Sequence, residues 1–193
     1  HSFPTRRSSD LVAEKIHTTW QNGDAANRQL TIVRPGVVFG KGENGNFTRL
    51  YWAIRGHKFA YPGRRDTIKA CIYVKELVRF MMYCLEHHEH GVELYNCCFE
   101  PAYTIQHIVD TMKRVTGLNQ LVPDIPNWII MSVATVMGAL GAPMGICPAR
   151  VRTLQISTNI SGKRLIASGY KFHYTFEEAM TDWYNDNDNL YLK

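Results

Sequence analysis

The stretch Gln29-Leu-Thr-Ile-Val-Arg-Pro-Gly-Val-Val-Phe-Gly40 decides how we interpret the rest of this chain. Leu30–Val33 is a short apolar and β-branched run, long enough for a buried strand and too short for a helix. Pro35 stops the strand because it lacks a backbone N–H, and Gly36 permits a close backbone approach. Open α/β sheets bind ligands just outside the carboxyl ends of their strands. We therefore expect either a ligand near this turn or a plain strand-ending turn.

Strands and helices alternate along the chain, and this alternation predicts an α/β fold. Helices are expected where apolar residues recur at helical spacing, and strands where short β-branched runs occur. Two threonines, Thr104 and Thr175, are predicted to cap helices at their N-termini, and Gly117 is predicted to end one. The expected helices are 12–22, 47–55, 76–86, 104–115 and 176–185, and the expected strands are 30–33, 58–61, 70–74 and 92–96.

Apolar side chains within two of these helices share a face. In helix 12–22 these are Ala13, Ile16 and Trp20. In helix 76–86 we expect a wider inward face, which packs in the core and does not bind a cofactor. Its members are Leu77, Phe80, Met81, Cys84 and Leu85.

Composition and charge are those of a globular protein with a moderately basic surface. The 193 residues are 45% hydrophobic and 20% charged, which suits one domain with a sizeable core. A formal charge of +5 and a pI near 9.0 suit an anionic ligand such as a nucleotide diphosphate. The basic residues form no long stripe, so nucleic acid is not indicated.

The cysteines indicate a reducing compartment, and we expect a cytoplasmic protein. There are five of them, an odd number, with no C-x-x-C pair, and the vicinal Cys97 and Cys98 cannot form an ordinary disulfide. His87, His88 and His90 cluster at the end of a predicted helix. We interpret them as cations near a helix C-terminus and expect no metal site.

The segment Trp128–Ile146 carries no charged residue. It is just long enough to suggest a membrane span. Its second half is interrupted by four helix-breaking residues, Gly138, Gly141, Pro143 and Gly145. We therefore expect a buried or lid helix here, with an interfacial membrane contact or a true span as the alternatives.

Four ordered segments resemble the extended short-chain dehydrogenase/reductase family of NAD(P)-dependent epimerases, dehydratases and reductases. Each match is short, and together they extend over nearly the whole chain. Glu76 departs from the family pattern, because an Asp is usual at its position. The four segments are Thr31–Gly40, Cys71–Val78, Tyr95-Asn96 with Tyr103–Val109, and Ser161–Lys163 with Ser168–Tyr170, Phe176–Ala179 and Asp182–Tyr184.

The resemblance implies the C-terminal part of a Rossmann-like parallel sheet plus a small α/β substrate-binding lobe. The complete protein would move a hydride between NAD or NADP and a sugar carbon, with a nucleotide sugar as substrate, and a homodimer is one expectation for it. Two alternatives stay open. One is a hydroxysteroid-dehydrogenase-like oxidoreductase, and the other is a non-catalytic protein that senses a dinucleotide or binds a partner.

Residues 1–11 do not resemble the family. They match the in-frame translation of a common short-read sequencing adaptor, so we expect an artefact there and the C-terminal portion of the epimerase-type domain over residues 12–193. By resemblance, Arg6 and Asp10 occupy the positions of the family's catalytic Tyr and Lys, and no Gly-rich dinucleotide loop precedes them. We expect no catalytic residue, no retained cofactor and no activity in this chain.

The resemblance also assigns candidate binding residues. The turn of Arg34, Pro35 and Gly36 would lie against the nicotinamide ring. Cations would bind a substrate diphosphate, although a lysine at position 69 lacks the two-pronged geometry of the family's arginine. A solvated helix face explains the two later arginines equally well, and a simple cap explains Asn46. The candidate substrate-binding residues are Asn46, Phe47, Lys69, Arg150 and Arg152.

Overall fold

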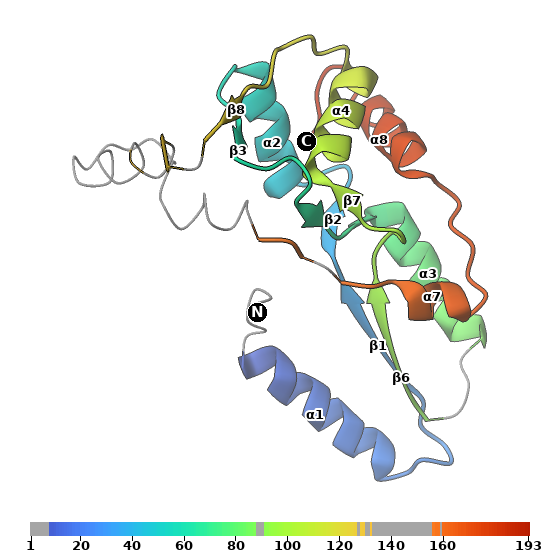
Figure 1. Ribbon diagram of the computed structural model, residues 1–193. Coiled ribbons are helices and arrows are strands. Elements are labelled where there is room, and N and C mark those ends of the chain that lie inside the picture. The colour runs from blue at the N-terminus through green and yellow to red at the C-terminus, as the bar shows by residue number, and fades with distance from the viewer. Residues whose placement is uncertain (1–7, 88–90, 127, 130–131, 133–155, 159) are drawn as a thin grey trace.

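The computed structural model describes residues 8–87, 91–126, 128–129, 132, 156–158 and 160–193 (Figure 1). Two long strands run side by side from the neighbourhood of the first helix, α1 (Ser8–Asn22), to a lobe of short strands and helices. The predicted α/β class is confirmed.

The two long strands form the parallel sheet that the opening stretch predicts. β1 (Leu30–Pro35) pairs with β6 (Val92–Cys97) in parallel, in a register that runs from Leu30 opposite Val92 to Pro35 opposite Cys97. The strands expected at 30–33 and 92–96 are confirmed. Each is longer than predicted at its carboxyl end, where they reach Pro35 and Cys97. Parallel strands need a long crossover, and the helices between β1 and β6 supply it.

Three shorter strand pairs build the lobe. β2 (Val37–Phe39) is parallel to β5 (Cys71–Tyr73), and β3 (Tyr61–Pro62) is parallel to β8 (Asp124–Ile125). β4 (Ile68–Lys69) runs antiparallel to β7 (Tyr103–Thr104).

The helices of the lobe lie close to their predicted positions. Thr104 accepts a hydrogen bond from the His107 N–H at 3.2 Å, and Gly117 ends that helix with a φ of 69°. Thr175 begins the last helix with a reciprocal capping box to Glu178. Both predicted caps are confirmed. The helices after α1 are α2 (Asn46–Arg55), α3 (Val74–His87), α4 (Ile105–Thr116), α7 (Lys163–Ala167) and α8 (Phe176–Asn185).

Aromatic rings fill the core of the lobe. Phe39, at the end of β2, is fully buried and lies at the centre of five rings. Its ring is stacked 4.7 Å from Phe47 of α2 and lies 5.5 Å from Phe176 of α8. Tyr73 of β5, Phe99 and Trp183 of α8 complete the contact at 5.4, 6.4 and 5.9 Å. One ring thus joins strands and helices from three distant parts of the sequence.

The inward face predicted for the helix now seen as α3 is too wide. Phe80 and Cys84 are buried, and Leu77 packs partly against the core, as expected. Met81 and Leu85 are 50% and 76% exposed, so their prediction is wrong. Only a narrow strip of α3 contacts the sheet, whereas the apolar residues of the helix extend beyond this strip.

Two predicted boundaries also need correction. The strand expected at 58–61 is β3, Tyr61–Pro62, because Tyr61 donates its N–H to the Pro123 carbonyl at 3.0 Å and pairs with β8. That partner lies more than 60 residues away, so local sequence does not reveal the register. The helix expected from residue 12 begins at Ser8.

Helix α1 turns a polar side toward the sheet. Gln21 is buried and donates to the Arg28 carbonyl at 3.1 Å, while Glu14 pairs with Arg34 of β1. Ile16 and Trp20 share a face, as predicted, but that face is 61% and 48% exposed at these two positions. The apolar side of α1 therefore faces away from β1.

The uncharged segment Trp128–Ile146 lies outside the described residues except at positions 128, 129 and 132. Within the part of the chain that the structure describes, no helix is long and apolar enough to cross a membrane.

The buried carboxylate of Glu76 holds the start of α3 to the segment that precedes α8. Glu76 is 0% exposed. Its Oε2 accepts a 2.6 Å hydrogen bond from the Tyr170 hydroxyl. Its Oε1 accepts from the backbone N–H groups of His173 and Tyr174 at 2.7 and 2.8 Å. A buried carboxylate is tolerated when its lone pairs are satisfied in this way.

Candidate functional site

The turn at Gly36 transfers the chain from one strand pair to the next. The Gly36 N–H donates to the Cys97 carbonyl on β6 at 3.0 Å, and the Val37 N–H donates to the Ala70 carbonyl at 2.9 Å. A Cβ on Gly36 would lie 2.7 Å from the Ala70 oxygen, so only glycine fits. The turn thus lies at the carboxyl end of β1, where a ligand is expected, and strand packing already explains its glycine.

The Arg34 side chain is engaged within the protein. Its Nε and Nη2 donate to the two carboxylate oxygens of Glu14 on α1 at 2.8 and 2.6 Å. Both side chains are partly buried, at 28% and 23% exposure. This two-pronged contact attaches α1 to β1. A ligand at the turn would therefore meet the backbone of Arg34 and not its charge.

Lys69 lies at the edge of the lobe beside a segment from far along the chain. The Thr158 N–H donates to the Ile68 carbonyl at 2.9 Å, and the Thr158 hydroxyl accepts from the Ala70 N–H at 3.2 Å. The Lys69 ammonium donates to the Ile156 carbonyl at 2.7 Å. Burial lowers the pKa of Lys69. The predicted diphosphate cation is half-buried and faces residues 156–158.

A cavity of about 320 Å³ follows the carboxyl end of β6. Glu100 accepts hydrogen bonds at its Oε2 from the Ser161 hydroxyl at 3.0 Å and from the Gly162 N–H at 2.7 Å. A Cβ on Gly162 would lie 2.6 Å from the Cys98 carbonyl, so the two loops touch through their backbones. Lys163 begins α7 at the same cavity, which Ile68, Pro101, Ala102 and Ile160 complete.

The start of α2 is already occupied by a carboxylate. Gly45 is the N-cap residue and makes no side-chain cap, so the alternative of a cap by Asn46 is wrong. Glu43 instead accepts the Thr48 N–H at 2.8 Å. The Phe47 ring points into the core, so only its backbone could reach a ligand. The glycines between Gly40 and Gly45 therefore do not leave this helix end open for a dinucleotide phosphate.

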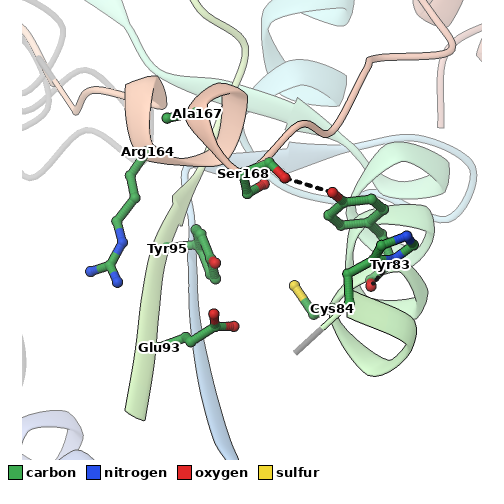
Figure 2. A pocket seen from close by; sticks show the side chains of 8 residues that line it. Tyr83, Cys84, Glu93, Tyr95, Arg164, Ala167 and Ser168 are labelled. Carbon is green, nitrogen blue, oxygen red and sulfur yellow. Dashed lines mark hydrogen bonds between the residues drawn. The ribbon is translucent and has the colours of Figure 1, made fainter. Parts of the chain in front are cut away.

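Another cavity, of about 330 Å³, lies beside the middle of β6 (Figure 2). Its walls are held by their own contacts. The Tyr83 hydroxyl donates to the Ser168 carbonyl at 2.6 Å, and the Arg164 guanidinium lies 5.3 Å from the centre of the Tyr95 ring. Glu93, also in the wall, helps to raise the pKa of Tyr95, after burial. This cavity is away from the strand ends, and we do not include it in the candidate site.

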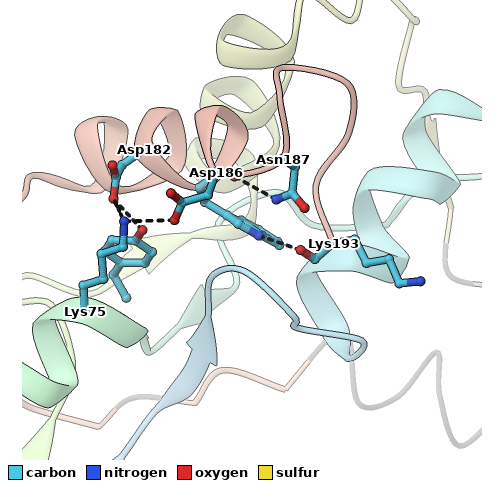
Figure 3. Close-up of polar contacts among 7 residues, drawn as sticks. Lys75, Asp182, Asp186, Asn187 and Lys193 are labelled. Carbon is cyan, nitrogen blue, oxygen red and sulfur yellow. Dashed lines mark hydrogen bonds and ion pairs between the residues drawn. The ribbon is translucent and has the colours of Figure 1, made fainter.

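A charged cluster fixes α8 to α3 (Figure 3). The Lys75 ammonium lies 2.6 Å from Asp182 and 2.9 Å from Asp186. The Tyr73 hydroxyl donates to Asp182 at 2.6 Å. Burial opposes ionisation of Asp182, but the hydrogen bonds from Lys75 and Tyr73 outweigh it and lower the pKa of this carboxyl below its ordinary value. The cluster is a structural contact of the lobe.

Replacing Lys75 by Met is expected to lower the free energy of unfolding near neutral pH but not in acid. A lowered folded-state pKa stabilises the protein above the unfolded pKa, about 3.9 for Asp, and this contribution is lost as pH falls through the folded pKa. Lys75 is 40% exposed, so we expect a loss of no more than about 1 kcal/mol near neutral pH. Urea unfolding at about pH 7 and about pH 3 should show the variant and the wild type converging in acid. Lys15→Met, on α1, is the control, and equal losses at both pH values would contradict the prediction.

Sequence reasoning missed the residues that line the cavity after β6. Glu100, Ser161 and Lys163 were not assigned a role, although Ser161–Lys163 is one of the segments that carry the family resemblance. The spacing of about 60 residues between the two loops gives no local signal that they meet. Arg150 and Arg152, the other predicted diphosphate cations, lie outside the described residues.

Comparisons with known proteins agree with this architecture. No family model matches the chain. A curated protein of Escherichia coli O157:H7, N-acetyl-alpha-D-glucosaminyl-diphospho-ditrans,octacis-undecaprenol 4-epimerase, is 27% identical over 184 residues. That match covers 89% of this chain and 53% of the relative. The chain therefore spans about half the length of the curated relative that it matches.

Solved structures show the same fold. UDP-N-acetylglucosamine 4-epimerase from Bacillus cereus matches with a TM-score of 0.62 at 18% identity, over 92% of this chain and 54% of that one. A human epimerase family protein solved with NADPH matches with a TM-score of 0.61 at 18% identity, over 89% and 55%. The resemblance to the extended short-chain dehydrogenase/reductases and the Rossmann-like fold class are thus confirmed. The hydroxysteroid-dehydrogenase-like and non-catalytic alternatives gain no support.

Proposed function

We propose that this chain, built like one half of an epimerase-type short-chain dehydrogenase/reductase, belongs to an NAD(P)-dependent enzyme for a sugar carried on a diphosphate. One observation carries the proposal. The parallel strands β1 and β6 end together, with Pro35 opposite Cys97, and a cavity that includes Lys163 follows the end of β6. Lys69 follows the cavity residue Ile68 in the sequence. Ligands bind at this edge of open α/β sheets. The relative and the solved epimerase named above are enzymes of sugar diphosphates.

The proposed contact with the cofactor is the turn Arg34–Gly36, through its backbone. A bound nicotinamide would accept and return a hydride. Residues for the cofactor's pyrophosphate are not evident in the described part of the chain, since the α2 N-terminus already has Glu43 as its anion. We therefore assign no reaction step to residues of this chain. Lys69, Arg150 and Arg152 remain proposed diphosphate ligands, and Asn46 and Phe47 remain proposed substrate contacts through their backbone.

This chain should bind NADH no more tightly than about 1 mM, the weak end of ordinary affinities. The reason is that the only cofactor contact we propose is a three-residue backbone turn. Isothermal titration of the 193-residue chain with NADH gives the measurement, and ADP-ribose, which lacks the nicotinamide, is the matched ligand. Micromolar binding of NADH would contradict this prediction.

The substrate class can be tested by ligand-observed NMR. We expect saturation transfer from the chain to UDP-N-acetylglucosamine and to N-acetylglucosamine linked by a diphosphate to a short prenyl chain. Both carry the same sugar diphosphate, and comparison of the two distinguishes a nucleotide from a lipid carrier. Free N-acetylglucosamine is the control, because it lacks the charge that Lys69 would bind. Failure of both diphosphates to bind would overturn the proposal.

A further inference from the structure

Helix α3 carries a second apolar face, the outer stripe, on the side away from its buried residues. Its four side chains are each 50–76% exposed. They recur at positions i, i+3, i+4 and i+7, so they form one continuous strip along about two turns of the helix. At about 100° per residue, the middle of this strip lies roughly opposite the buried Phe80. The outer stripe consists of Val78, Met81, Met82 and Leu85.

The outer stripe is large enough to be a contact site. Exposed apolar patches on the order of 400 Å² are often functional on monomeric proteins, and four side chains that are half exposed or more reach about this size. Stable interfaces bury about 800 Å² on each partner, and smaller ones are weak and reversible. A contact made by the outer stripe alone should therefore be reversible.

Two charged residues border the outer stripe on the same side. Arg79 directly follows Val78, and Glu86 directly follows Leu85, so the opposite charges are roughly 10 Å apart along the helix axis. Both side chains are exposed, and neither makes an ion pair within the described part of the chain. One edge of the stripe thus changes from positive to negative along its length.

This order of charges selects how a second α3 could pack against the first. In a parallel pair, the charged edges of the two copies would lie on opposite sides of the contact and would not meet. In an antiparallel pair about a two-fold axis, both edges lie on the same side, and Arg79 of each copy lies roughly level with Glu86 of the other. The apolar residues also match, because Val78 then faces Leu85. The outer stripe is therefore self-complementary only in the antiparallel arrangement.

We propose that α3 of this chain packs on α3 of a second copy, antiparallel, through the outer stripe. Side chains at i, i+3, i+4 and i+7 form the hole that receives a side chain from the facing helix, and Leu85 is the most exposed of the four. A membrane surface fits less well, because helices that lie on lipid are bordered mainly by basic residues and this edge includes Glu86. None of these residues belongs to the turn at Gly36 or to the cavity after β6, so the contact is independent of the proposed function.

Sedimentation velocity of the 193-residue chain tests the contact. It should show a reversible monomer–dimer equilibrium with a Kd on the order of 10–100 μM. Met82→Lys places a charge in the middle of the contact and should raise this Kd at least about tenfold. Trp20→Lys is the matched control, because Trp20 is an exposed apolar residue of α1, and it should leave the Kd unchanged. Thermal unfolding verifies that each variant is folded.

Charge reversal tests the antiparallel arrangement. Arg79→Glu and Glu86→Arg each bring like charges together twice across the two-fold axis, so each should raise the Kd by about fivefold at low salt. The double variant restores opposite charges and should return the Kd to within about twofold of the wild type. A role of either residue in folding alone would not produce this rescue.

A chain that stays monomeric at about 1 mM would overturn the inference, as would a double variant without rescue. If Trp20→Lys weakened the dimer as much as Met82→Lys, the contact would lie on α1 and the inference would be wrong. Binding to vesicles of phosphatidylcholine and phosphatidylglycerol that Met82→Lys abolishes would assign the outer stripe to lipid and would also overturn it.

Discussion

Replacing Glu76 by Ala is expected to lower the free energy of unfolding by roughly 3–5 kcal/mol, because each buried donor left without an acceptor costs about 1–3 kcal/mol. The substitution strands three donors, the Tyr170 hydroxyl and the N–H groups of His173 and Tyr174. A loss of this size is a large fraction of the roughly 5–15 kcal/mol that stabilises a domain. Urea unfolding followed by circular dichroism gives the value.

The control for Glu76 lies on the same helix. Glu86 is exposed near the end of α3, so Glu86→Ala should change stability by no more than about 0.5 kcal/mol. A second variant, Tyr170→Phe, removes one of the three donors and leaves Glu76 with its two hydrogen bonds from the backbone. It should cost less than Glu76→Ala. If Glu76→Ala cost no more than Glu86→Ala, the carboxylate would not hold α3 to the segment before α8.

The Phe39→Ala substitution should cost about 3–5 kcal/mol, the usual range for truncating a buried phenylalanine. Phe39 is fully buried and touches rings from α2, β5 and α8. Its removal leaves a cavity where helices from both ends of the lobe meet, and those helices cannot close on it without moving. Thermal unfolding should show a lower midpoint, and near-ultraviolet circular dichroism should show weaker aromatic bands.

Trp52→Ala is the matched control for Phe39. Trp52 is a larger ring, but it is 45% exposed on the outer side of α2. Its loss removes less buried surface, so the variant should be destabilised by clearly less than Phe39→Ala. Equal losses would mean that the ring cluster around Phe39 does not organise the lobe.

Features decided by neighbouring residues were predictable from the sequence. Leu30–Val33 is confirmed as part of a parallel strand because its composition and its Pro-Gly stop are local. Thr104 and Thr175 are confirmed as caps for the same reason, since a cap involves residues three positions apart.

Features decided by distant contacts were not predictable. Glu76 lies in the first turn of a helix, where an exposed carboxylate would suit the dipole equally well, and its partners are 94–98 residues away. The apolar pattern of α3 did not show that its sheet contact is narrow, so Met81 and Leu85 were placed wrongly. The cavity after β6 needs two loops whose contact no spacing rule predicts. The resemblance named one of those loops and gave it no role.

The turn at Gly36 determines how the lobe is oriented relative to the β1–β6 pair. The consecutive residues Gly36 and Val37 make the last hydrogen bond to β6 and the first hydrogen bond beside β5. The missing methyl group at this position lets the two strand pairs share a single connecting peptide. Adding that methyl would displace β2, and with it Phe39 and every ring assembled around it. The orientation of the lobe relative to the ends of β1 and β6 therefore depends on the absence of a side chain at Gly36.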